Sequence, residues 1–133
     1  MDDAVQKALD LTPAADAAER TIDITTIGAK SGEPRRIEIW FHKVDGHWFI
    51  TGSPGRARSW YANLVANPHF SFHLKHGVEA DLPAKARPVT DADERRSVFT
   101  GMIAALPSSG NGEWPPLEAW LEKSPLVEVE FAA

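Results

Sequence analysis

The sequence predicts a small antiparallel β-barrel with inserted helices, a mainly β architecture of the α+β class. Short segments rich in β-branched and aromatic residues alternate in hydrophobicity, and they outnumber the helical segments. Short turns join the first three of these segments, as in an antiparallel meander. The chain has 133 residues, which suits one domain with one core. Closing six or seven short strands into a barrel leaves no exposed sheet edge.

Residues 1–20 precede the first predicted strand. Residues 3–18 predict a short helix with Ala4, Ala8 and Leu11 on one face, limited by Pro13. The alternative is a mobile N-terminal extension. We assign residues 1–133 to a single domain that includes this segment.

Three strands joined by short turns follow. Residues 21–27 alternate so that Ile22, Ile24 and Thr26 share one face. After a turn at residues 28–32, a second strand covers residues 35–43. Asp45-Gly46 predicts a two-residue hairpin, because both turn positions need a positive φ, and the third strand covers residues 47–51.

The middle of the chain predicts a helix and then a strand. Residues 59–67 (SWYANLVAN) form the helix, which Ser59 caps and Pro68 stops. Residues 69–76 predict a strand whose apolar face consists of Phe70, Phe72 and Leu74. Residues 78–89 predict a further strand, or two strands broken near Pro83.

The last third of the chain predicts two helices and a final strand. The acidic run at residues 90–94 begins a helix, because acids in a first turn suit the helix dipole. Its apolar stripe includes Val98, Phe99 and Leu106. A long loop at residues 107–116 precedes a short helix at residues 117–122, and the last strand covers residues 126–131.

Composition excludes several classes of function. A formal net charge of −5 argues against a general nucleic-acid binder. The chain has no cysteine, which excludes disulfides and cysteine-based zinc sites. The N-terminus lacks the features of a signal peptide, and no apolar run reaches the roughly 18 residues of a membrane span. We therefore expect a cytoplasmic protein with no integral membrane segment.

Positive charge gathers around two glycine-containing loops. Between Lys30 and Arg58 the chain has six cations and three acids, a local balance of +3. A Ser-Gly turn directs N–H groups and a hydroxyl at an anion. The second loop, at residues 52–58, leads into a helix N-terminus, which also favours anions. These loops predict a site for an anionic ligand; the alternative is a pair of solvated hairpin loops.

The histidines do not predict a metal site. His69 and His73 would lie about 13 Å apart on a strand that rises roughly 3.3 Å per residue, so they cannot bind one ion. His42, beside Trp40 on one strand face, is a better candidate for a ligand contact or a proton donor. Nucleophile-elbow, P-loop and dinucleotide-binding motifs are absent from the sequence. If the protein is an enzyme, a cofactor supplies the reactive centre.

Two motifs together resemble a known family. The run TTIGAKSGEPRRIEIWF, the Asp-Gly hairpin and the run GSPGR…WYANLVANPHFSFHL occur in this order over residues 21–88. They resemble the deazaflavin-dependent nitroreductase and quinone reductase family. The resemblance implies a split β-barrel of the FMN-binding type that binds 8-hydroxy-5-deazaflavin (coenzyme F-420). Its reduced form would pass a hydride to a small-molecule electron acceptor, namely a quinone, a nitro compound or an activated alkene (enone).

The resemblance also implies a cofactor site. One group of residues would hold the cofactor phosphate and acidic tail: Lys30, Ser31, Gly32 and Arg35. The strand from Ile37 through Ile39 to Trp40 would lie along the ring. A third group would close over the cofactor or shape the pocket: Thr51, Gly52, Ser53, Gly55, Arg56, Trp60 and Asn63.

This chain departs from the family pattern at several positions. Ala29 stands in place of a basic residue, and Glu38 replaces a proline and brings an acid toward an anionic cofactor. The C-terminal half has no tyrosine, so Trp114 or Trp120 is expected on the substrate side. Two alternatives stay open: an FMN-dependent oxidoreductase of the same fold, or a non-catalytic cofactor carrier. The sequence allows a monomer or a homodimer.

Overall fold

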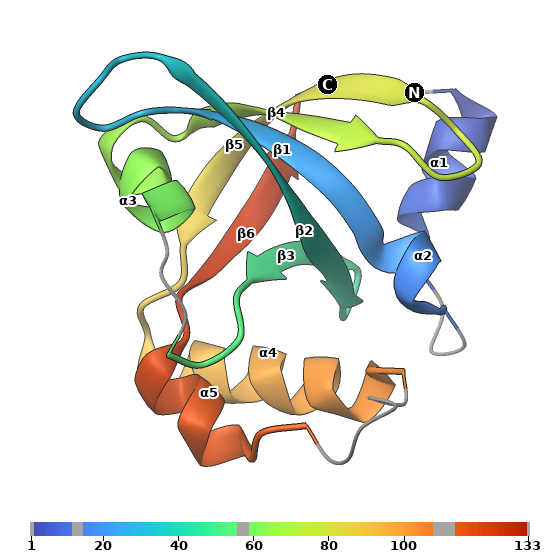
Figure 1. Ribbon diagram of the computed structural model, residues 1–133. Helices are drawn as coiled ribbons and strands as arrows, with labels where there is room; N and C mark the ends of the chain where they lie inside the picture. The colour runs from blue at the N-terminus through green and yellow to red at the C-terminus, as the bar shows by residue number, and fades with distance from the viewer. Residues whose placement is uncertain (1, 12–14, 56–58, 108–113, 133) are drawn as a thin grey trace.

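Six antiparallel strands close into a barrel, which confirms the predicted fold (Figure 1). The computed structural model describes residues 2–11, 15–55, 59–107 and 114–132. Around the barrel the strand order is β1-β2-β3-β6-β5-β4, and β4 pairs with β1 to complete the circle. The strands are β1 (Thr21–Ile27), β2 (Pro34–Val44), β3 (His47–Thr51), β4 (His69–Leu74), β5 (Ala80–Pro88) and β6 (Leu126–Phe131).

The first three strands form the predicted meander. In the β1–β2 ladder Ile22 lies opposite Ile39, and alternate residues of β1 are buried. The β2–β3 turn has φ of 52° at Asp45 and 80° at Gly46. Positive φ at both positions is the geometry that an Asp-Gly hairpin provides. The turn therefore fixes the register in which Phe41 lies opposite Ile50.

Strand β5 runs through Pro83 without a break, so the alternative of two broken strands is wrong. Pro83 lies opposite Ser71 in the β4–β5 ladder, and its carbonyl oxygen accepts a hydrogen bond from Ala132 N at 3.1 Å. The N and O atoms of a strand residue point to the same side. The missing N–H of Pro83 therefore faces the end of β6, and pairing with β4 loses nothing.

In the described part of the chain five helices accompany the strands: α1 (Asp3–Leu9), α2 (Ala17–Arg20), α3 (Ser59–Ala66), α4 (Ala92–Ala105) and α5 (Leu117–Lys123). The single helix predicted over residues 3–18 is wrong. Helix α1 ends at Leu9, because Asp10 leaves the helical region with ψ of 68°. Helix α2 then begins with a reciprocal capping box between Asp16 and Glu19. The buried face of α1 consists of Val5 and Leu9, and Ala4 is exposed.

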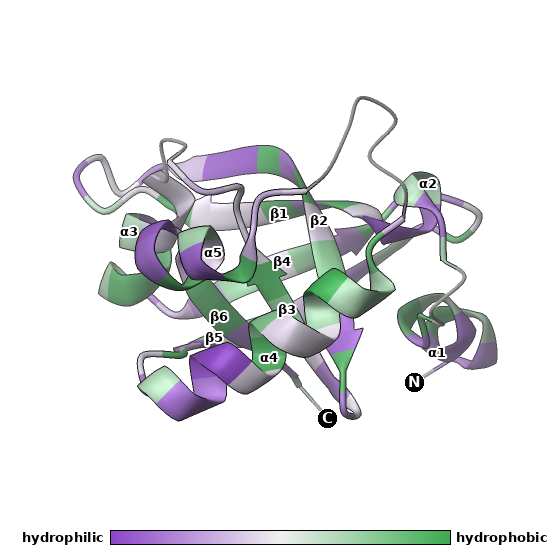
Figure 2. Cartoon of the chain, turned by 90° about the horizontal axis from the view of Figure 1, so that it is seen from below, coloured by the Kyte–Doolittle hydropathy of each residue, from purple (hydrophilic) through white to green (hydrophobic). Residues whose placement is uncertain are grey.

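Apolar side chains form two cores. The first fills the barrel and contains Ile24, Phe41 and Phe72, each fully buried. The second lies between the helices α4 and α5 and the strands, and it includes Phe49, Phe99 and Leu126. Figure 2, seen from below, shows α4 and α5 lying across β3, β5 and β6. Among the described residues no helix has the length and apolar character needed to cross a bilayer.

Candidate cofactor-binding cleft

A cleft of about 440 Å³ lies where the barrel meets the helices, and we call it the central cleft. Strand β2 and the end of β3 form one wall of the cleft. Side chains from α3, from α5 and from the segment between α4 and α5 form the rest of its lining. This volume lies within the roughly 300–1,000 Å³ that is typical of ligand sites. The lining residues are Ile37, Glu38, Ile39, Trp40, His42, Thr51, Gly52, Ser53, Trp60, Leu106, Trp114 and Trp120.

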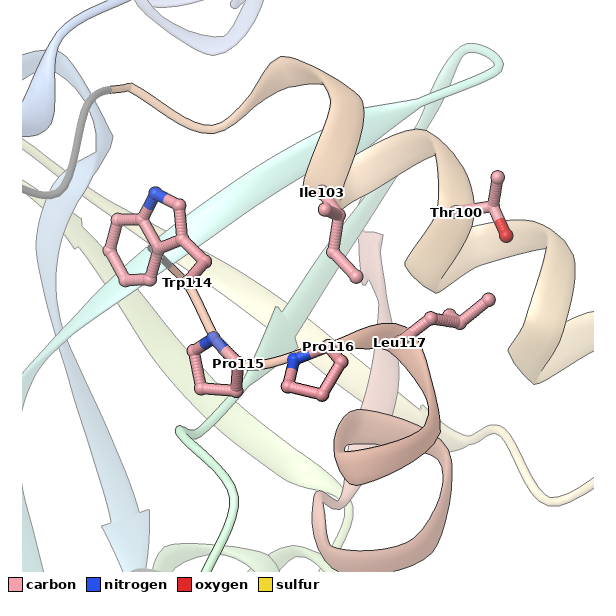
Figure 3. A pocket seen from close by; sticks show the side chains of 6 residues that line it. All are labelled: Thr100, Ile103, Trp114, Pro115, Pro116 and Leu117. Carbon is pink, nitrogen blue, oxygen red and sulfur yellow. The ribbon is translucent and has the colours of Figure 1, made fainter. Parts of the chain in front are cut away.

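Four of the five tryptophans line the central cleft. Trp40 and Trp114 meet edge to face, with ring centroids 5.9 Å apart and an interplanar angle of 65°. Backbone carbonyls fix two of the indoles: Trp114 Nε1 donates to Pro107 O at 2.8 Å, and Trp120 Nε1 donates to Pro115 O at 2.9 Å. Rigid aromatic walls of this kind suit a flat, conjugated ligand. Trp114 also lines a second, apolar pocket (Figure 3).

The wall at the end of β3 is tied to the residues that follow α5. The Thr51 hydroxyl donates to Pro125 O, and the Ser124 hydroxyl donates to Gly52 O at 2.7 Å. Because these two bonds join segments more than 70 residues apart, they hold residues 51–53 against α5. Ser53 adds a further hydroxyl to the lining.

Four of the six amides in the turn between β1 and β2 (residues 28–33) are used within the protein, three of them inside the turn and one by α3. Gly28 N donates to Glu33 O at 2.8 Å, and Gly32 N donates to Gly28 O at 2.9 Å. Glu33 N donates to Ser31 Oγ at 3.2 Å. A Cβ on Gly28 would lie 2.4 Å from Ser31 Oγ, so a side chain here would displace the hydroxyl that accepts from Glu33 N. An anion at this turn would therefore be held mainly by side chains rather than by a nest of amides.

Asn63 supports the turn from below and does not line the central cleft. Its Oδ1 accepts from Ala29 N at 2.8 Å, and its Nδ2 donates to Thr26 Oγ1 at 3.0 Å. Asn63 is buried, so these bonds satisfy polar groups that would otherwise be costly. Figure 1 shows α3, the helix that contains Asn63, beneath the tip of the β1–β2 hairpin.

Two exposed cations of this region have no carboxylate partner among the described side chains. Neither Lys30 nor Arg35 forms an ion pair with any residue that the structure describes. Arg36, the next residue, donates from Nε to Asp23 Oδ2 at 2.9 Å. Alternation along β2 places Arg35 on the face of Ile37 and Ile39, and Arg36 on the face of Glu38. Residues of both faces line the central cleft, so ion pairing is what distinguishes the two arginines. Arg35 is therefore available to an anion and Arg36 is already paired.

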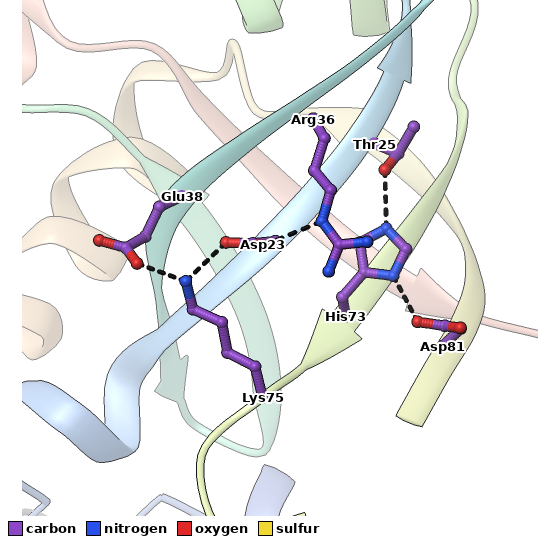
Figure 4. Close-up of polar contacts among 7 residues, drawn as sticks. All are labelled: Asp23, Thr25, Arg36, Glu38, His73, Lys75 and Asp81. Atoms are coloured by element: carbon purple, nitrogen blue, oxygen red, sulfur yellow. Dashed lines mark hydrogen bonds and ion pairs between the residues drawn. The ribbon is translucent and has the colours of Figure 1, made fainter. Parts of the chain in front are cut away.

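Glu38 belongs to a charge network on the outer face of the barrel (Figure 4). Lys75 Nζ contacts the Glu38 carboxylate and also donates to Asp23 Oδ1 at 2.8 Å. Burial acts to raise the pKa of Asp23, but the hydrogen bonds from Lys75 and Arg36 outweigh it and lower that pKa. Lys75 thereby balances the acid that Glu38 adds to the edge of the central cleft. In the same face His73 bridges Thr25 and Asp81.

His42 is a buried, neutral imidazole in the lining of the central cleft. Burial lowers its pKa to about 3, and the positive charge of Arg20 adds to this effect. Its Nδ1 has no hydrogen-bond partner within the described structure. A general acid works best when its pKa lies near the working pH. Because the His42 imidazole is neutral near pH 7, its lowered pKa argues against the predicted role of proton donor.

Arg20 is a buried residue that the sequence did not single out. It is 2% exposed and donates from a terminal guanidinium nitrogen to Ala105 O at 2.7 Å. Its Nε donates to Ala15 O at 3.3 Å. A cation at the last carbonyls of α4 complements the helix dipole. Arg20 thus fixes the end of α4 beside Leu106, which lines the central cleft.

The structure brings together only part of the predicted site. The residues found in the lining are Ile37, Ile39, Trp40, His42, Thr51, Gly52, Ser53 and Trp60. Those outside it are Lys30, Ser31, Gly32, Arg35, Gly55 and Asn63. Arg56 lies outside the described residues. Both Trp114 and Trp120 line the cleft, whereas Leu106 was expected only in the apolar stripe of its helix. No cluster of metal-ligating side chains occurs in the described part of the chain.

Residues 14–112 match the family model described as F420H(2)-dependent quinone reductase. The chain belongs to this family. The family assignment makes the protein a deazaflavin-dependent reductase that uses coenzyme F-420 and a small-molecule acceptor. It confirms the resemblance that the two motifs carried.

Solved structures agree with the assignment. A structure titled as an F420-H2 dependent reductase is 26% identical, with a TM-score of 0.59 over 87% of this chain and 96% of that one. A domain-swapped dimer is 24% identical, with a TM-score of 0.58 over 96% and 95% of the two chains. A putative pyridoxamine 5′-phosphate oxidase from Listeria innocua is 8% identical, with a TM-score of 0.63 over 98% and 93%. The likeness to the Listeria protein, together with the closed six-stranded barrel, shows that this reductase has the split-barrel fold.

Proposed function

We propose that this reductase transfers a hydride from reduced 8-hydroxy-5-deazaflavin to a quinone, and that nitro compounds and enones are further acceptors. One observation carries the proposal. The central cleft joins the β2 segment from Ile37 to Trp40 with the segment from Thr51 to Ser53. The family resemblance assigns the first segment to the ring and the second to the group that closes over the cofactor. When bound, the cofactor would supply a hydride, and the quinone would take up that hydride and a proton to become a hydroquinone.

The lining of the central cleft fits such a ring. Ile37, Ile39 and the indoles of Trp40 and Trp60 offer apolar surface for a flat ring. Ser53 and the oxygen of Thr51 offer polar contacts to its edge. Outside the cleft, Lys30 and Arg35 would hold the phosphate and acidic tail, since both cations have no ion-pair partner among the described residues.

The side chains of the cleft would orient the reactants, and they need not supply a proton. His42 is neutral at physiological pH because burial lowers its pKa to about 3. As a neutral imidazole, His42 would offer the ligand a polar contact with one N–H donor. We therefore assign the proton to solvent water that reaches the acceptor. Positioning of two reactants is by itself a large source of rate enhancement.

The test compares two adjacent arginines. Arg35→Ala removes the unpaired cation, and Arg36→Ala removes the one bound to Asp23. Both residues are exposed and both changes remove one charge. Titration with coenzyme F-420, followed by fluorescence quenching, should show weaker binding for Arg35→Ala by about 1–3 kcal/mol, the range for a charged hydrogen bond. Arg36→Ala should bind as the parent does.

Equal losses in the two variants would contradict the phosphate assignment, because a nonspecific charge effect would then explain both. Parallel titration with FMN tests the choice of cofactor, and tighter binding of FMN would overturn the deazaflavin proposal. Assays with quinone, nitro and enone acceptors follow on the loaded protein. Tight binding of the cofactor with turnover of none of them would identify a carrier.

A further inference from the structure

We propose that the apolar pocket beside Trp114 binds the alkyl chain of a quinone acceptor whose headgroup lies in the central cleft. This inference rests on the proposed function and names a subsite for its substrate. The apolar pocket has a volume of about 460 Å³ and is lined by Thr100, Ile103, Trp114, Pro115, Pro116 and Leu117 (Figure 3).

The pocket has almost no free hydrogen-bonding capacity. Five of its six lining residues are apolar or aromatic. The two side-chain polar hydrogens of the lining are used within the protein: Thr100 Oγ1 donates to Arg96 O at 2.7 Å, and Trp114 Nε1 donates to Pro107 O at 2.8 Å. A polar ligand would lose its hydrogen bonds to water here without replacing them. The pocket therefore suits a hydrocarbon.

Trp114 joins the pocket to the central cleft. The same indole lines both cavities, and its ring meets Trp40 on the cleft side at 5.9 Å. In Figure 3, Trp114, Pro115 and Pro116 lie on one side of the pocket, facing Ile103 on α4. The pocket is thus the apolar surface that adjoins the central cleft. An acceptor in the cleft could place an apolar extension there.

The subsite lies partly outside the region that defines the family. The family model matches residues 14–112, whereas the wall from Trp114 to Leu117 follows that region. One wall of the pocket therefore comes from α4 inside the matched region, and the other comes from the residues that follow it. It would set a preference among quinones by their chains, while the headgroup and cofactor contacts belong to the central cleft.

The experiment uses one benzoquinone headgroup with and without a decyl chain. Each methylene that the pocket buries should strengthen binding about fourfold. If the pocket buries two methylenes of the decyl chain, KM should fall by about 15-fold relative to the bare headgroup. Ile103→Glu places a charge in the pocket and does not alter the lining of the central cleft. It should remove most of the advantage of the chain and leave the KM of the bare headgroup unchanged. The matched control, Ala104→Glu on an exposed position of α4, should keep the advantage.

A second measurement does not depend on turnover or on the folding of a variant. Methyl NMR spectra of the parent protein, without cofactor, should show shifts of the Ile103 and Leu117 methyl groups with the decyl quinone. The bare headgroup should not shift them. Absence of these shifts would overturn the inference. An equal rise in KM for both quinones in Ile103→Glu would also overturn it. If neither quinone is reduced while the methyl shifts appear, the pocket binds the chain and the proposed quinone activity fails.

Discussion

Replacing His42 with glutamine should remove a pH dependence from the stability of the protein. His42 is 4% exposed and its Nδ1 has no partner among the described groups. Burial, with a smaller contribution from Arg20, lowers its pKa from 6.5 to about 3. Between these two values the unfolded chain binds a proton that the folded chain does not. Stability is therefore lost as the pH falls from about 6.5 toward 3.

The size of this effect follows from the two pKa values. One pKa unit corresponds to about 1.4 kcal/mol. At pH 5 the free energy of unfolding is about 2 kcal/mol lower than at neutral pH because of His42 alone. The hydrogen-bonded carboxyl groups of Asp10, Asp23 and Glu94 have lowered pKa values, so their contributions are lost at a more acidic pH.

Urea unfolding of the parent and of His42→Gln, at pH 7.5 and pH 5, measures the difference directly. The parent should lose about 2 kcal/mol more than the variant over this interval. Any constant cost of the substitution cancels, because each protein is compared with itself. Parallel stability curves for the two proteins would refute the reasoning, since His42 would then titrate equally in both states. The same result would reopen its role as a proton donor.

Two further predictions concern packing. Phe72→Ala should destabilise the fold by about 3–5 kcal/mol, because Phe72 is fully buried. Its ring centroid lies 5.2 Å from that of Phe41 and 5.0 Å from that of Phe131. A change below about 1 kcal/mol in urea unfolding would contradict this packing. Gly101→Ala should destabilise by about 1–3 kcal/mol despite the better helix preference of alanine, since the new Cβ would lie 2.7 Å from Val44 Cγ1. Adding Val44→Ala should recover part of that loss, and a more stable single variant would refute the clash.

The strands of this protein were predictable because each depends on local information. Alternation along residues 21–27 marks which side chains enter the barrel, and the Asp-Gly pair sets the turn that follows β2. The N-terminal helix was overestimated, because residues 3–18 contain few strong stops besides Pro13. Burial of Val5 and Leu9 against the barrel decided its extent, and that contact lies outside the local sequence.

The site was predictable where it follows one strand and not where distant segments meet. Ile37, Ile39 and Trp40 line the cleft as expected because they share β2. The use of Ala29 N by Asn63 depends on a contact between residues 34 positions apart. Arg20 reaches Ala105, 85 residues away. Neither contact leaves a periodic pattern in the sequence, so only the fold reveals them.

Ion pairing decides which cations remain for the cofactor. The sequence places Glu38 where it would oppose an anionic cofactor, and the barrel gives that acid a partner in Lys75. Asp23 binds both Lys75 and Arg36, so two acids and two cations balance on the outer face. Lys30 and Arg35 stay outside this balance in the described structure. The loss of a basic residue at position 29 therefore leaves two cations near the turn, while the amide of residue 29 serves to hold the turn on α3.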